Sequence, residues 1–310
     1  MKPAAGSSLY AHWLLNIYRG IYRHSPIKFG LSRIAAELRP YLVPNQESTD
    51  ALLQDTRLGH QKNSRGQQGF MAELDLRDRI QFMMYARGCH EPATEQLFAD
   101  KLTSDACFVD IGANIGYFSL LAAALKPKAR IFAFEPMPHN TNTFRRNIKL
   151  NGFSNITVVE KAVGEVSGAA WIEAPDPIRE SGWNTIWTTK PTASEQKSGL
   201  EIVQIVKLDD FLDAAKAPAV DFIKIDVEGA ELAVLKGATQ TLTAPGRRQL
   251  IVELNEACLS AHGTSSKEVN ALLLGLGYEC FRIRRNGSIV ASSSIDSEKT
   301  DNRNFYYVKD

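Results

Sequence analysis

Short apolar runs alternate with amphipathic segments along most of the chain after residue 70. A short apolar run bounded by polar residues or glycine predicts a strand, whereas apolar residues spaced three and four apart predict a helix. By these patterns, strands are expected at residues 107–111, 130–134, 156–159, 203–206, 222–226, 249–254, 278–283 and 304–308, and helices at 92–102, 115–125, 138–150, 230–237 and 266–274. Residues 71–85 contain shorter stretches that resemble strands.

The order of these elements predicts an α/β fold. Apolar strands that alternate with amphipathic helices are typical of a parallel sheet covered by helices on both faces. The segments 278–283 and 304–308 lie too close together in the sequence for a crossover helix, so they are expected to pair antiparallel. The expected architecture is therefore a Rossmann-like mixed sheet whose last strand is antiparallel.

The first 69 residues have a different character. Helical spacing of apolar residues covers residues 8–43, and residues 44–69 turn polar, which predicts a helical extension followed by a linker. We therefore expect an extension at 1–69 and a main domain at 70–310. The helices fit packing against the main domain or against a partner subunit of a homo-oligomer. Their aromatic and basic residues also fit peripheral contact with a membrane.

Composition and charge narrow the function classes. The chain has 310 residues, of which 44% are apolar and 23% charged, so it can bury a full core. A net charge of +1 disfavours nucleic acid as a partner, because phosphate binding requires a basic surface. The four cysteines are scattered, no signal peptide is visible and no apolar run is long enough to span a membrane. These features predict a reduced, cytoplasmic protein.

A loop that contains two glycines follows the strand expected at 107–111. The sequence Phe108-Val-Asp-Ile-Gly-Ala-Asn-Ile-Gly116 places Asp110 at the strand end, turns at Gly112 and leads into a helix after Gly116. In open α/β sheets a ligand binds at the carboxyl ends of the strands, and glycines there permit tight turns and close approach. Asp110 is suited to attract the amino group of a cationic amino-acid ligand, which favours S-adenosylmethionine as the cofactor.

A second acid, Glu135, ends the next strand, where a carboxylate can accept hydrogen bonds from ribose hydroxyls. A nicotinamide dinucleotide is disfavoured, because Asn114 stands where the G-x-G-x-x-G fingerprint needs its second glycine. The alternative that Asp110 and Glu135 only cap the helices that follow them is weaker, since both stand at strand ends.

Four segments together resemble the FkbM family of methyltransferases, and the resemblance covers about residues 80–260. They are Phe108-Val-Asp-Ile-Gly-Ala-Asn-Ile-Gly-Tyr-Phe-Ser119, Phe134-Glu-Pro136, Asn147-Ile-Lys-Leu-Asn-Gly152 and Phe222-Ile-Lys-Ile-Asp-Val-Glu-Gly-Ala-Glu-Leu-Ala-Val-Leu-Lys-Gly237. The resemblance implies a class I methyltransferase fold that uses S-adenosylmethionine. It also implies methylation of a hydroxyl of a sugar, glycolipid or natural product.

The expected cofactor-binding residues come from these motifs and from the segment after the third strand. The set is Asp110, Gly112, Ala113, Asn114, Gly116, Tyr117, Glu135, Pro136, Ala162, Val163 and Asp226. By the same resemblance, Ala162 and Val163 flank the adenine. Ordinary packing at a strand end would explain these two residues nearly as well.

The methyl acceptor is expected past the fourth parallel strand, where Asp226 and Glu228 follow. These acids share a direction if the strand continues, and burial beside a second carboxylate raises the pKa of one of them, which suits a general base. Glu253 ends the next strand on the same side and His262 follows in the next loop, so all four are candidate bases. We expect no metal, although the three acids together would suit magnesium.

Two other functions remain open on the same fold. One is methylation of nucleic acid or protein, although the fourth strand end lacks the Asn/Asp-Pro-Pro-aromatic run of amino-directed DNA enzymes. The other is a membrane-apposed nucleotide-binding module without catalysis, which the intact acids Asp110, Glu135 and Asp226 disfavour. The favoured acceptor is a small molecule, a glycan or a glycolipid.

Overall fold

The computed structural model describes residues 53–62, 68–173, 185–187, 200–292, 295 and 303–310, together with Trp13 and Ile17. Trp13 and Ile17 have helical backbone, and the rest of the predicted helical extension lies outside the described residues. Its contact with a membrane or a second subunit stays a prediction. Within the described part of the chain, no helix is both long and apolar enough to cross a lipid bilayer.

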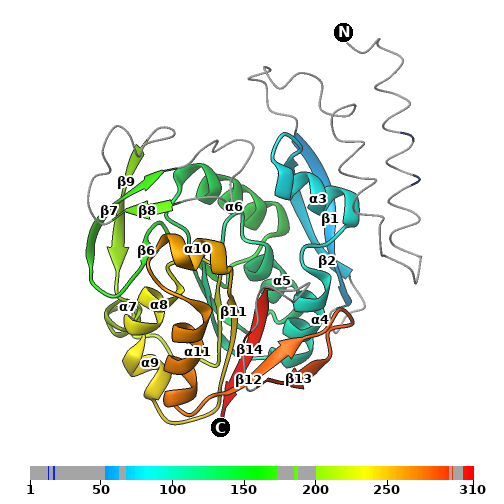
Figure 1. Cartoon of the computed structure of the whole chain (residues 1–310). Helices are drawn as coiled ribbons and strands as arrows, with labels where there is room; N and C mark the ends of the chain where they lie inside the picture. The colour runs from blue at the N-terminus through cyan, green and yellow to red at the C-terminus, as the bar shows by residue number, and fades with distance from the viewer. Residues whose placement is uncertain are drawn as a thin grey trace.

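An eight-stranded sheet forms the centre of the molecule (Figure 1). Its strands in spatial order are β13 (Ile289–Ala291), β12 (Glu279–Ile283), β14 (Asn304–Lys309), β11 (Arg248–Glu253), β10 (Phe222–Ile225), β3 (Cys107–Ile111), β4 (Arg130–Phe134) and β5 (Ile156–Val159). The strands from β11 to β5 are parallel, whereas β14 pairs antiparallel with both β11 and β12. The antiparallel pairing predicted for the last strand is therefore confirmed.

Helices cover both faces of this sheet. On one face lie α4 (Pro92–Lys101), α5 (Tyr117–Leu125) and α6 (Pro138–Asn151); on the other lie α7 (Leu208–Ala214), α8 (Glu231–Lys236), α9 (Thr239–Thr243), α10 (Glu256–Ala261) and α11 (Ser266–Gly275). Side chains alternate between two cores: Phe108 and Phe222 join the core with α4 and α5, whereas Val109 and Ile223 join the core with α8 and α11. Burial on both sides explains why these strands are apolar apart from Asp110 and Lys224.

The strand order changes direction at β3 and fits the Rossmann-like mixed sheet that the sequence predicted. From β3 the chain builds outward to β5 and then returns to add β10 on the other side of β3. In an open α/β sheet, the reversal of strand order opens a crevice beyond the carboxyl ends of the strands. The fold therefore points to a ligand site beyond β3 and β10.

A smaller sheet follows β5 in the sequence. Its order is β6 (Ala162–Val163), β9 (Leu200–Val206), β7 (Gly168–Glu173) and β8 (Thr185–Trp187). The strand predicted at 203–206 belongs to this sheet and not to the central one. Because β6 comes directly after β5, the second sheet begins beside the carboxyl edge of the central sheet.

The region from residue 53 to residue 87 differs from its prediction. β1 (Leu53–Lys62) pairs antiparallel with β2 (Gln68–Asp75), so the predicted polar linker is wrong for β1, and the boundary at 69/70 falls within a hairpin. Part of the strand-like stretch at 71–85 is the helix α3 (Arg79–Arg87), which begins after Asp78. β1 is rich in polar residues, so apolar periodicity gave no strand signal there.

Gly116 begins α5 with φ = +86°. A Cβ at this position would lie 2.1 Å from the ring of Phe144 on α6. Gly116 therefore serves the packing of α6 against the start of α5. The close approach of a ligand, which the sequence suggested for this glycine, is not its structural reason.

We predict that Gly116→Ala lowers the free energy of unfolding by roughly 2–4 kcal/mol, because it adds left-handed strain and forces Phe144 to move. Urea unfolding measures the loss. Gly152→Ala is the matched control, since Gly152 has φ = +65° but no atom within 4 Å of the added Cβ. That variant should lose only about 1–2 kcal/mol of strain. Equal losses in the two variants would contradict the packing role.

Candidate functional site

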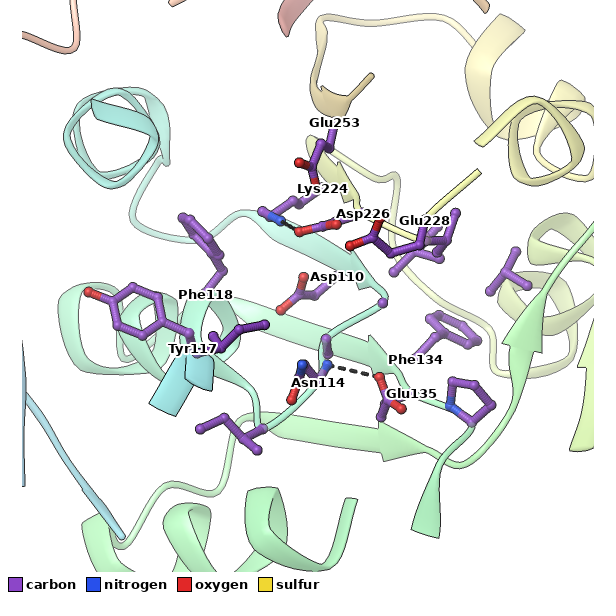
Figure 2. A pocket seen from close by; sticks show the side chains of 18 of the residues that line it. Asp110, Asn114, Tyr117, Phe118, Phe134, Glu135, Lys224, Asp226, Glu228 and Glu253 are labelled. Carbon is purple, nitrogen blue, oxygen red and sulfur yellow. Dashed lines mark hydrogen bonds and ion pairs between the residues drawn. The ribbon is translucent and has the colours of Figure 1, made fainter. Parts of the chain in front are cut away.

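A cavity of about 280 Å³ lies beyond the carboxyl ends of β3, β4, β10 and β11 (Figure 2). The predicted site residues that line it are Asp110, Gly112, Ala113, Asn114, Tyr117, Glu135, Pro136, Ala162, Val163, Asp226, Glu228 and Glu253. Gly116 and His262 do not line it. The fold thus brings acids that follow or end four different strands to one cavity.

The loop after β3 is fixed by backbone contacts with both neighbouring strands. The amides of Gly112 and Ala113 donate to the carbonyl oxygen of Phe134, each at 3.0 Å. Gly112 has φ = +80°, and a Cβ there would lie 1.8 Å from the carbonyl oxygen of Asp226. Only glycine therefore lets the loop after β3 lie this close to the end of β10. This close contact between the two backbone segments forms the floor of the cavity.

Glu135 is held in place by three donors. Its Oε2 accepts from the amide of Asn114 at 2.9 Å, and its Oε1 accepts from the amide of Met137 at 3.0 Å and from Nδ2 of Asn140 at 3.1 Å. Burial raises the pKa of Glu135 to about 7, against the lowering effect of these hydrogen bonds. The carboxyl group is thus fixed in orientation at the strand end, where it can receive further donors from a ligand.

Asp110 is buried at the end of β3, and Ser119 of α5 donates to its Oδ2 through Oγ at 2.7 Å and through its amide at 3.1 Å. Burial raises the pKa of Asp110 to about 6, and the positive charge of Lys224 opposes the rise. In Figure 2, Asp110 lies between the pair formed by Lys224 and Asp226 and the pair formed by Asn114 and Glu135. It is therefore central to the cavity.

Lys224 is a site residue that the sequence reasoning missed. It lies on β10 directly beside Asp110 in the sheet register, and only 3% of its side chain is exposed. Its Nζ lies 2.7 Å from Oδ2 of Asp226 and 4.8 Å from the ring centroid of Phe118. Burial would lower the pKa of Lys224, but Asp226, Glu91 and Asp110 raise it above its usual value. Lys224 is thus a permanent cation among carboxylates.

Asp226 and Glu253 form a hydrogen-bonded pair of acids. Burial would raise the pKa of Asp226, but Lys224 and the hydrogen bond from Glu253 hold it at about 2. Burial and the charge of Asp226 raise the pKa of Glu253 well above its usual value. Lys224 therefore favours the ionised form of Asp226, whereas burial and the charge of Asp226 favour the protonated form of Glu253.

Glu228 lines the cavity from the turn after β10. Its backbone is left-handed, with φ = +51°, so the strand does not continue as the sequence reasoning assumed. Its Oε2 accepts from Sγ of Cys258 at 3.1 Å and from Nδ2 of Asn255 at 3.5 Å. Burial, followed by the charge of Asp226, raises the pKa of Glu228. Glu231 supports this turn, because its Oε1 accepts from the amide of Gly229 at 3.1 Å.

His90 and Glu91, which the sequence reasoning also missed, line the cavity from the segment before α4. Glu91 is left-handed with φ = +45°, and its buried Oε2 has no hydrogen-bond partner among the described residues. Such strain is typical of functional sites. Glu91, Asp226 and Glu253 each place an oxygen within 4.8 Å of the others. Because Lys224 already neutralises Asp226, this group of acids is suited to hydrogen bonding more than to a divalent cation.

His262 is not placed to act as the predicted base. It follows α10, and its Nδ1 lies 2.9 Å from the carbonyl oxygen of Cys258, which requires the proton on Nδ1. A Cβ on Gly229 would lie 2.3 Å from this nitrogen, so the imidazole packs behind the turn that carries Glu228. Tyr117 does line the cavity, but its hydroxyl is directed to Oε2 of Glu95 at 2.5 Å.

The family comparison agrees with the fold and with the cavity. The domain described as "Methyltransferase FkbM domain" matches residues 110–280, which include the end of β3, all of β10 and most of the acids around the cavity. The fold is thus that of a class I methyltransferase. The chain belongs to the FkbM methyltransferase family.

Similar proteins include a hexuronic acid methyltransferase and a 2-O-methyltransferase. "Hexuronic acid methyltransferase AglP" of Haloferax volcanii is 29% identical over 57% of this chain and 65% of its own length, so the chain spans just under two thirds of that relative. "2-O-methyltransferase NoeI" of Sinorhizobium fredii is 26% identical over 55% of this chain and 74% of its own length. Among solved structures, M. jannaschii TYW2 in complex with AdoMet has a TM-score of 0.39 and 13% identity, covering 84% of this chain and 85% of that one.

We predict that Lys224→Met lowers the free energy of unfolding by roughly 3–5 kcal/mol, because it removes the buried cation and leaves the mostly buried carboxylate of Asp226, which is 21% exposed, without its ion-pair partner. The double variant Lys224→Met/Asp226→Asn should recover part of this loss. Lys236→Met is the control, since Lys236 pairs with Glu165 at 3.5 Å on the surface, and it should cost at most about 1 kcal/mol. Chemical denaturation of the four proteins measures the differences. A loss at Lys224 no larger than at Lys236 would refute the buried charge balance.

Proposed function

We propose that this protein transfers the methyl group of S-adenosylmethionine to a hydroxyl oxygen of a sugar, glycolipid or natural product. The observation that carries the proposal is the position of Asp110 and Glu135 at adjacent strand ends, facing one cavity whose other acids follow β10 and β11. The hexuronic acid and 2-O-methyl relatives support a sugar hydroxyl as the acceptor.

The residues of the cavity fit the parts of the cofactor. Glu135 is oriented to accept from the ribose hydroxyls, and Asp110 supplies a negative charge for the amino group of the methionine part. Ala162 and Val163 are buried, line the cavity and offer an apolar surface for the adenine. Asp226 and Glu228 then lie at the methyl end.

When bound, S-adenosylmethionine supplies an electrophilic methyl group on a sulfonium. Lys224 keeps Asp226 ionised, so Asp226 provides a fixed negative charge beside the reacting atoms. An acid with a pKa of about 2 is a weak base, and burial beside Asp226 disfavours the ionised form of Glu253. Burial and the charge of Asp226 raise the pKa of Glu228, which makes its carboxylate a stronger base than that of Asp226. We assign proton removal from the acceptor hydroxyl to Glu228, as the O–C bond forms and the C–S bond breaks.

Calorimetric titration with S-adenosylmethionine and with NAD tests the cofactor. We expect binding of S-adenosylmethionine only, and we expect Asp110→Ala and Glu135→Ala to weaken it by roughly tenfold or more, because each removes a charged hydrogen-bonding group. Glu279→Ala, which removes an exposed acid on β12, should leave it unchanged. Binding of NAD alone, or equal affinities in all variants, would overturn the assignment of the cavity.

Transfer of labelled methyl groups tests the acceptor class. A panel of methyl glycosides and hexuronic acids should become labelled, and Glu228→Gln should slow labelling while leaving the affinity for S-adenosylmethionine within about threefold. Labelling of protein or nucleic acid, with none of the sugars, would contradict a hydroxyl acceptor of this class.

A further inference from the structure

Both edges of the hairpin strand β2 form hydrogen bonds. One edge pairs with β1, and the other faces α6. Asn147 of α6 accepts from the amide of Glu73 at 2.7 Å and donates to its carbonyl oxygen at 3.4 Å. Asn151 accepts from the amide of Met71 at 2.8 Å and donates to its carbonyl oxygen at 2.6 Å. The two asparagine amides thus give β2 the hydrogen bonds that a neighbouring strand would supply.

The spacing of these contacts explains why a helix can replace a strand here. Residues four apart on a helix lie on one face, about 6 Å apart along the axis. Alternate residues of a strand are about 6.7 Å apart and direct their backbone groups to the same edge. Asn147 and Asn151 therefore match Glu73 and Met71, respectively, in register. Asn147 is completely buried, so the contact is part of the core.

The hairpin is tied in turn to α3. The amide of Asp75 donates to Oε1 of Gln81 at 2.8 Å, and Asp75 forms a buried ion pair with Arg77 at 2.6 Å. At the other end of α3, the amide of Gly59 donates to the carbonyl oxygen of Gly88 at 2.9 Å. Because both ends of α3 are bonded to the hairpin, the position of β2 determines the position of α3.

The segment placed in this way forms one wall of the cavity. Ile80 and Met84 of α3 line it, and so do His90 and Glu91 directly after Gly88. The same helix α6 also touches the opposite wall, since Asn140 near its start donates to Glu135. Neither Asn147 nor Asn151 lines the cavity.

We propose that Asn147 and Asn151 form a latch, the pair of side chains that holds β2 against α6, and that they are positioning residues for the cofactor cavity. The latch fixes residues 68–91 so that Ile80, Met84, His90 and Glu91 close one side of the cavity. This inference rests on the proposed function in taking the cavity to be the site of S-adenosylmethionine. In this proposal, the sequence motif at 147–152 docks the hairpin onto α6 and does not contact the cofactor.

The full-length double variant Asn147→Ala/Asn151→Ala tests the latch. Without cofactor, we expect hydrogen exchange in residues 68–91 to accelerate by roughly tenfold or more, while β10 and β11 keep their protection. We expect the affinity for S-adenosylmethionine, measured by calorimetry, to fall by roughly tenfold. If the double variant does not fold, Asn151→Ala alone removes the less buried half of the latch and should shift both quantities in the same direction.

Asn155→Ala is the matched control. The side chain of Asn155 also donates to backbone, at 2.9 Å to the carbonyl oxygen of Ala129, but it touches neither the hairpin nor the cavity. It should change neither quantity in a folded protein. Exchange and affinity within twofold of wild type in the latch variants, or equal shifts in the control, would overturn the proposal. If the wild type does not bind S-adenosylmethionine, the proposed cofactor is wrong. Hydrogen exchange alone then tests whether the latch fixes residues 68–91.

Discussion

The charge balance around Lys224 is the constraint on which the rest of the site depends. This lysine is buried on β10, the strand added at the reversal of strand order, and it contacts Asp226 while lying beside Asp110 in the sheet. Without a cation, acids from β3, β10 and β11 could not all occupy the same small cavity, because like charges in a poorly solvated site repel strongly. Lys224 favours the ionised form of Asp226, and the charge of Asp226 in turn favours the protonated form of Glu253. The acids can therefore take different roles.

The second constraint is the close approach of the backbone segments next to Lys224. Gly112 lets the loop after β3 pass against the end of β10, and its amide is bonded to the end of β4. The loop is consequently fixed between two strands before any ligand arrives. Glu135 is fixed in a similar way by donors from the loop and from α6. A site with so many internal contacts is preorganised, which suits a reaction that depends on alignment of acceptor oxygen, methyl group and sulfur.

The sequence predicted the parts of the site that follow from strand ends. In a parallel sheet, the ends of all strands meet at one edge, so Asp110, Glu135 and Asp226 could be brought together from their positions alone. Lys224 was missed because a lysine inside an apolar run looks like a surface residue. Its spacing of two from Asp226, which places both side chains on the same face of a strand, was the available signal.

Other residues could not be found in this way, because only tertiary contacts place them. Glu91 lies before α4 and reaches the cavity through the docking of the hairpin and α3. The sequence pattern predicted a linker where β1 lies and strand-like stretches where α3 lies, although β2 does cover the start of those stretches. The predicted base His262 does not line the cavity, for the opposite reason. It follows a strand end in the sequence, but α10 carries it behind the turn at Gly229.

A crystal structure of the full-length protein with S-adenosylhomocysteine tests the central claim, that the cavity beyond β3, β4 and β10 holds the methyl donor. The account predicts ribose oxygens within about 3 Å of the carboxyl group of Glu135. It also predicts the sulfur at the end of the cavity that carries Asp226 and Glu228. A nucleotide bound elsewhere, or one with its adenosine at the Asp226 end, would contradict the account.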